Sequence, residues 1–105
     1  MTDYVVVLIT ASGEEEAGKI AHALVSGRLA ACVNIMKNIR SIYRWQGKVE
    51  DEAEALMIAK TRRSLLADLT ARVKELHSYT VPEVIALPIL EGSGDYLRWL
   101  GEETS

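Results

Sequence analysis

The sequence has no phenylalanine, one cysteine and two prolines in 105 residues. Without phenylalanine, the interior has to be filled by valine, isoleucine, leucine, methionine and alanine. A single thiol, Cys32, excludes an intrachain disulfide framework. No apolar run approaches the roughly 20 residues of a membrane-spanning helix, and residues 1–3 lack the basic region of a secretory signal. These absences predict a cytoplasmic protein with no membrane partner.

The chain also has only a small excess of one charge sign, since its net charge is -3. A protein that captures nucleic acid needs a strongly basic face, so we expect no nucleic-acid partner. Apolar residues make up 49% of the chain and charged residues 26%, which is ordinary for a folded protein. The length suits one domain, and we expect residues 1–105 to form it.

Hydrophobic periodicity predicts the first strand and the first helix. The segment Tyr4 to Ile9 is an unbroken apolar run, typical of a strand buried on both faces. Ser12 followed by Glu15 has the spacing of a capping box. The apolar residues that follow recur at helical spacing until Gly27, which suits a left-handed helix end.

A hairpin is expected next, with strands at 29–45 and 49–61 and its turn at Gln46-Gly47-Lys48. Residues 50–60 are strong helix formers, so propensity favours a helix there, whereas spacing from Gly47 favours the returning strand. We predict the strand.

The remaining signals predict two more helices and one strand. Ser64 is the expected cap of a helix that ends near His77. The strand Val84 to Leu90 contains Pro88, which indicates a strand exposed on one hydrogen-bonding side or ending early. Asp95 is the expected cap of a short final helix.

This order predicts an α+β fold: a ferredoxin-like βαββαβ sandwich with a long hairpin between its second and third strands and a short C-terminal helix. Two helices cover only one face of a four-stranded sheet, whereas the first and last strands are apolar on both faces. Further copies of the same chain are the commonest cover for such a face. We therefore expect a homo-oligomer.

Four segments, spread over nearly the whole chain, carry a family likeness. They are Arg28 to Ile35, Ser41 to Lys48 followed by Glu54 and Lys60-Thr61, Leu76 to Glu83, and Tyr96 to Trp99. In these segments the chain resembles the CutA family of divalent-cation tolerance proteins. The resemblance implies a tight homotrimer in which the long hairpin of one subunit extends the sheet of the next. It also implies a cytoplasmic protein linked to tolerance of copper and other divalent metals.

The family's metal binding is attributed to a cysteine late in the first strand and a histidine pair before a Tyr-x-x-Pro-Glu motif. Here Ile9 stands at the cysteine position, Leu76 at the first histidine, and Ser78 where the family usually has proline, so only His77 remains. Cys32 is the only thiolate for a soft metal such as Cu(I). His77 and Cys32 are therefore the candidate ligands for copper or another divalent cation. Their structural alternatives are a histidine that satisfies helix-end carbonyls and a small core hydrophobe.

The other polar residues receive simpler interpretations. The acidic runs Glu14 to Glu16 and Glu50 to Glu54 are attributed to helix-start electrostatics and to a solvated hairpin edge. His22 lies off the apolar stripe of its helix and is expected to be solvated.

A further set combines aromatic and charged types within the family-like segments; its members are Tyr43, Trp45, Lys60, Glu83 and Trp99. One interpretation is an inter-subunit cleft with aromatic walls and a Lys60–Glu83 pair, able to hold a small-molecule ligand. The other is that the aromatics pack a subunit interface and the charged pair satisfies itself. No organic cofactor is expected.

The leading functional hypothesis is a non-catalytic homotrimer involved in divalent-metal tolerance, which binds copper weakly or acts indirectly. The alternative is a trimeric regulatory protein that binds a small molecule or nucleotide in inter-subunit clefts, by analogy of fold with nitrogen-regulatory proteins. No glycine-rich phosphate loop specifies ATP. An enzyme would need a nucleophile beside a base, or a metal with an open position, and no such motif is present.

Overall fold

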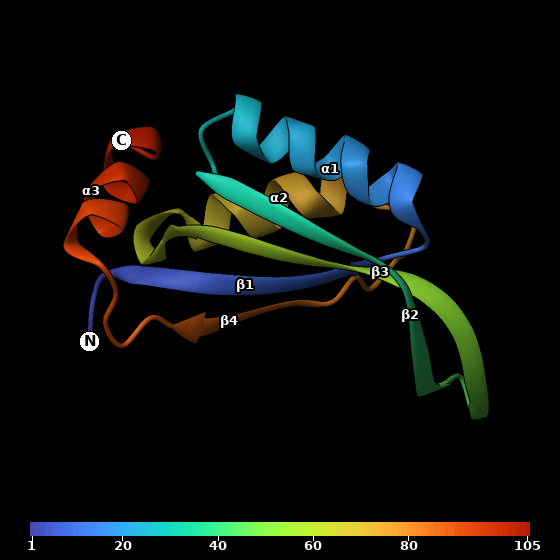
Figure 1. Ribbon diagram of the computed structural model, residues 1–105. Coiled ribbons are helices and arrows are strands. Elements are labelled where there is room, and N and C mark those ends of the chain that lie inside the picture. The colour runs from blue at the N-terminus through green and yellow to red at the C-terminus, as the bar shows by residue number, and fades with distance from the viewer.

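A four-stranded antiparallel sheet organises the chain, and the computed structural model describes all of residues 1–105. The elements in order are β1 (Tyr4–Ala11), α1 (Glu14–Ser26), β2 (Cys32–Trp45), β3 (Lys48–Arg62), α2 (Leu66–Leu76), β4 (Val84–Pro88) and α3 (Gly94–Glu103). The strand order is β2-β3-β1-β4. Helices α1 and α2 cover one face of the sheet, and α3 lies at one end (Figure 1). The predicted βαββαβ order with a short C-terminal helix is confirmed.

The core lies between the sheet and the two long helices. Alternate residues of β1 and β3 point toward the helices, and these pair across the ladder, as Val7 does with Ala59 and Ile9 with Met57. The helices contribute Ile20, Leu24, Leu69 and Val73, all fully buried. As the absence of phenylalanine predicts, the interior is filled by aliphatic and methionine side chains.

The hairpin of β2 and β3 extends beyond the helices and bends away from the rest of the sheet (Figure 1). Gln46 and Gly47 form its turn with φ values of 48° and 79°, the left-handed pair that a two-residue hairpin turn requires. A bulge between Met36 and Ile39 interrupts the ladder, with Asn38 at φ 56°. The helix-forming residues 50–60 lie in β3, so the prediction of a strand is confirmed.

The opposite face of the sheet has no helix over it. It carries the other alternate residues of the strands, of which seven are large and apolar: Val6, Leu8, Met36, Leu56, Ile58, Ile85 and Leu87. Ile85 and Leu87 are each 53% exposed and Met36 51%. In the single chain β1 is therefore buried on one face and only half-buried on the other, not buried on both. We call these seven residues the bare face.

The ends of the first helix differ from the predictions. Gly13 is the N-cap residue of α1, and Ser12 bonds Glu16 instead of closing a box with Glu15. At the other end Gly27 has φ −84°, and Arg28 takes the left-handed conformation at φ 60°. The Arg28 guanidinium donates to the carbonyl oxygens of residues 102 and 105. These distant contacts offset the strain of a non-glycine residue in this conformation.

The other helix starts also differ. Ser64 lies inside a 3-10 turn, Arg63–Leu65, that precedes α2, and its side chain makes no cap. Ser93, not Asp95, caps α3 by accepting a hydrogen bond from the backbone N–H of Tyr96. Asp95 pairs instead with Arg98 at 3.1 Å.

The last strand is shorter than predicted, because it ends at Pro88 and not at Leu90. It pairs only with β1 and is therefore an edge strand, where a missing N–H is tolerated. None of the helices combines the length and apolarity needed to cross a membrane.

Candidate functional site

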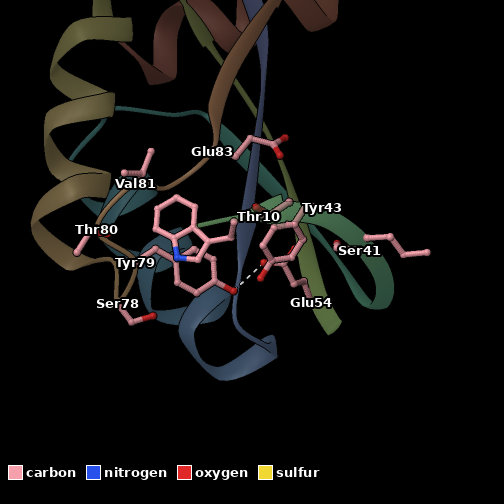
Figure 2. Close-up of a pocket in the computed structure, with 11 residues that line it drawn as sticks. Thr10, Ser41, Tyr43, Glu54, Ser78, Tyr79, Thr80, Val81 and Glu83 are labelled. Atoms are coloured by element: carbon pink, nitrogen blue, oxygen red, sulfur yellow. Dashed lines mark hydrogen bonds between the residues drawn. The ribbon is translucent and has the colours of Figure 1, made fainter. Parts of the chain in front are cut away.

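A cavity of about 690 Å³ lies where the hairpin leaves the sheet, beside the segment that links α2 to β4. We call it the hairpin-root pocket. It is lined by Thr10, Ser41, Ile42, Tyr43, Trp45, Glu54, Ser78, Tyr79, Thr80, Val81 and Glu83 (Figure 2). Its volume falls within the range of small-molecule sites.

The pairing register of β2 and β3 determines which side chains of the hairpin face the pocket. Alternate residues of a strand share a face, so Ser41, Tyr43 and Trp45 point the same way. The ladder pairs Ile39 with Glu54, which puts the Glu54 side chain on that same face. The Tyr43 hydroxyl donates to Glu52 Oε2 at 3.3 Å. Burial and then the neighbouring carboxylates, of which Glu52 is the strongest, raise the pKa of Tyr43.

Glu54 is the buried carboxylate of the pocket, with only 6% of its surface exposed. The Tyr79 hydroxyl donates to its Oε2 at 2.7 Å, as the dashed line in Figure 2 shows. Burial and then this carboxylate raise the pKa of Tyr79. The prediction of a solvated hairpin edge is therefore wrong for Glu54, because the link after α2 folds over it.

His77 holds that link against the sheet, and its side chain is fully buried. Its Nδ1 accepts the backbone N–H of Tyr79 at 3.1 Å, and its Nε2 lies 2.7 Å from the carbonyl oxygen of Thr10. Because an amide N–H only donates and a carbonyl only accepts, these bonds make Nδ1 the acceptor and Nε2 the donor. The side chain bonds β1, not the helix-end carbonyls that the sequence suggested. A metal ion would have to displace one of these two bonds.

Glu16 ties the start of α1 to the same link. Its Oε1 accepts from the N–H and the hydroxyl of Ser12, and its Oε2 accepts from the N–H of Ser78 at 2.7 Å. Burial alone would raise the pKa of this carboxyl, but the bonds from Ser12 and Ser78 outweigh it and lower the pKa to about 2. Glu16 therefore has a specific structural role beyond helix-start electrostatics.

Substitution of Glu16 by glutamine is expected to destabilise the fold by about 1–2 kcal/mol at neutral pH. The folded pKa of about 2 lies below the ordinary 4.5, so the contribution is complete above pH 4.5 and is lost as the pH falls through 2. Denaturant unfolding of the parent and of Glu16→Gln along this range measures it. Glu15→Gln, on the same helix turn and exposed, is the control. A stability difference that stays constant down to pH 2 would contradict the assignment.

Cys32 lies elsewhere, near the start of β2 on the side of the bare face, and is half-exposed. Its Sγ is 4.0 Å from Lys60 Nζ and 3.7 Å from Asn34 Oδ1. Burial, and after it the nearby Cys32, raise the pKa of Tyr96, a residue of α3. His77 lies beside Thr10, at the other end of β1 from the Val6 that pairs with Lys60. The two candidate ligands are thus not brought together, and no group of three or more metal-ligating side chains exists in the chain.

Within one chain, the five residues predicted to form an inter-subunit cleft lie in two groups, and a cleft between subunits stays a prediction. Tyr43, Trp45 and Glu83 line the hairpin-root pocket. Lys60 hydrogen-bonds Asn34 and approaches Cys32, and Trp99 packs on Tyr96 with ring centroids 5.4 Å apart. Lys60 makes no ion pair with Glu83 of the same chain, and their pairing across subunits stays a prediction.

Sequence reasoning missed the residues that complete the pocket. Glu54 and Tyr79 lie within the segments that resemble the family, and that likeness was the one signal available for them. Thr10 belongs to a strand whose pattern concerns packing alone. Its contribution follows only from the tertiary arrangement.

Comparisons with known proteins identify the family. A model of the CutA1 divalent ion tolerance protein family matches residues 5–103. The divalent-cation tolerance protein CutA of Thermus thermophilus is 57% identical over 99 residues, which cover 94% of this chain and 96% of that protein. The chloroplastic protein CutA of Arabidopsis thaliana is 51% identical over 100 residues, 95% of this chain but 55% of that protein. The chain thus spans nearly all of the bacterial relative and about half of the plant one.

Solved structures agree with the sequence match. The T. thermophilus divalent cation tolerance protein superimposes with a TM-score of 0.94 at 55% identity, covering 97% of this chain and 99% of that one. The CutA structure from Xylella fastidiosa has a TM-score of 0.96 at 35% identity and covers 99% of this chain and 100% of its own. The chain belongs to the CutA1 divalent ion tolerance protein family.

Proposed function

We propose that this protein acts in tolerance of divalent cations as a non-catalytic homotrimer that binds copper or another divalent cation weakly. The observation that carries the proposal is the family match over residues 5–103. The relatives that match are named for divalent-cation tolerance in Thermus and in Pectobacterium.

The bare face supports assembly. Seven apolar side chains on one face of the sheet, three of them more than half exposed, form the kind of surface that subunit contact removes from water. The projecting hairpin supports the trimer implied by the family, since its free strand edge can extend the sheet of a neighbouring subunit.

Weak metal binding is assigned to Cys32. It is the only thiol, it is half-exposed and its sulfur is not bonded to another sulfur. One chain offers no group of three ligands, so a full set would require symmetry-related copies. The Lys60 ammonium beside the sulfur opposes a cation, which fits low affinity.

Titration of the assembled protein with Zn(II) by calorimetry, and with Cu(I) by competition against a chromophoric chelator, tests the metal proposal. Saturable binding is expected, and Cys32→Ser is expected to weaken it by about tenfold or more, because a soft metal loses its only thiolate. Absence of saturable binding in the parent protein would remove the direct-binding form of the proposal.

A second function is favoured by the hairpin-root pocket itself: a regulatory protein that binds a small molecule there. The pocket has suitable volume and an aromatic wall. Its lining includes no lysine or arginine, so a nucleotide would lack a partner for its phosphates. A thermal-shift screen of metabolites tests this function, because a ligand of the folded protein raises its melting temperature.

A further inference from the structure

The lining of the hairpin-root pocket has an unusual chemical balance. Three aromatic rings, from Tyr43, Trp45 and Tyr79, share it with two carboxylates, from Glu54 and Glu83. Within one chain, no basic side chain lines it. The cations of the hairpin around the pocket, Lys37, Arg40, Arg44 and Lys48, are absent from the lining. Lys37 lies 3.4 Å from Glu14, and Arg40 is held by Asp51 at 2.6 Å. Glu52 accepts a hydrogen bond from the Tyr43 hydroxyl at 3.3 Å, so the charged side chains at the pocket within one chain are acidic.

Glu54 gives this pocket a directed acceptor. The side chain is 6% exposed and takes part in no ion pair within the chain, and its one hydrogen bond, from Tyr79, uses Oε2. Oε1 makes no hydrogen bond, yet every fully buried side-chain nitrogen or oxygen in the structure has a hydrogen-bond partner. Oε1 is therefore open to the cavity. A buried carboxylate usually has a cationic or metal partner.

The aromatic rings of the pocket also favour a cationic ligand. The Glu54 carboxylate lies between the side chains of Tyr43 and Tyr79 (Figure 2). The face of an aromatic ring carries negative electrostatic potential and attracts ammonium or guanidinium groups. Carboxylate and ring faces thus favour the same class of ligand, whereas an anion would be repelled by both.

We propose that the hairpin-root pocket binds a small organic cation, an ammonium or guanidinium compound. The inference rests on the second function above and specifies its ligand. The charged group packs among the rings of Tyr43, Trp45 and Tyr79 and is neutralised by Glu54, while Glu83 contributes long-range attraction. A bare divalent ion fits this site poorly, because no three ligating groups converge in it.

Three probes of one shape but different charge test the proposal: tetramethylammonium, tert-butanol and pivalate. Each is titrated into the assembled protein at matched ionic strength, with the indole N–H signals of Trp45 and Trp99 followed by NMR. Trp99 lies on α3, outside the pocket lining of its own chain, and its signal is followed for comparison. The cation is expected to shift the Trp45 signal saturably, and at least about tenfold more tightly than the other two probes.

Two variants sharpen the test. Glu54→Gln keeps the shape and an oxygen for the Tyr79 bond but removes the charge, and is expected to weaken tetramethylammonium binding about tenfold. Asp68→Asn, which removes an exposed carboxylate on α2, is expected to leave it unchanged. Equal binding of tert-butanol or pivalate, no shift of the Trp45 signal by any probe, or unchanged affinity in Glu54→Gln would each overturn the inference. A neutral or anionic hit in the metabolite screen that shifts Trp45 would keep the second function while rejecting a cationic ligand. The metal titrations are unaffected by either result.

Discussion

Leu8→Glu is expected to convert the assembled protein into folded monomers. In the ladder Leu8 pairs with Ile58 on one side and Ile85 on the other, at the centre of the bare face. Closure by a second chain would bury a glutamate there without a cationic partner, which costs several kcal/mol per subunit. In the single chain residue 8 is only half-buried, so a carboxylate can remain in water and the fold can survive.

Sedimentation velocity gives the mass of the variant, and circular dichroism shows whether it is folded. Val25→Glu is the matched control, since Val25 is 43% exposed on α1, on the covered side of the sheet. It is expected to keep the mass of the parent. A parent protein that sediments as a monomer of 11.6 kDa, or a Leu8→Glu variant with unchanged mass, would contradict closure of the bare face by copies of the chain.

The strand over residues 50–60 shows how far local pattern can predict this fold. Both alternate sets of β3 are largely apolar in its second half, with Ala55, Met57 and Ala59 facing the helices and Leu56 and Ile58 on the bare face. No polar and apolar alternation therefore distinguishes it from a helix. The turn at residues 46–47 does, because a tight left-handed pair returns the chain antiparallel.

The helix ends were predicted less well, because more than one residue near each end can serve as a cap. Arg28, not Gly27, is left-handed, since its side chain reaches carbonyls more than 70 residues away in the chain. Ser93 replaces Asp95 as the cap of α3 for a similar reason, as Asp95 has Arg98 for a partner. Such choices depend on contacts that a sequence window does not contain.

The same limit explains why the pocket could be predicted only in part. Strand alternation puts Tyr43 and Trp45 on one face of the hairpin, but a shared face does not give position along a strand. Within one chain Lys60, also on β3, therefore lies beside Cys32 and not in the pocket. Its place in a cleft between subunits stays a prediction. The Glu54–Tyr79 bond joins residues 25 apart across the link that His77 fixes, and no periodicity specifies it.

His77→Ala is expected to destabilise the protein by about 2–4 kcal/mol per subunit, because it removes two buried hydrogen bonds and leaves a cavity. The imidazole connects Thr10 of β1 to the backbone of Tyr79 and packs on the Tyr79 ring with centroids 4.6 Å apart. Its loss frees the link over the pocket. Denaturant unfolding at one fixed protein concentration measures the effect, since an oligomer's stability depends on concentration.

His22→Ala is the control, because His22 is exposed on α1, and a change within about 0.5 kcal/mol is expected for such a surface site. The same two variants, titrated with Zn(II) and Cu(I) under folding conditions, separate structure from metal binding. Because both ring nitrogens of His77 are already bonded to the backbone, His77→Ala is expected to leave metal affinity unchanged. An unaltered stability together with a large loss of metal affinity would instead make His77 a ligand, and would require the ring to leave Thr10 or Tyr79 when metal binds.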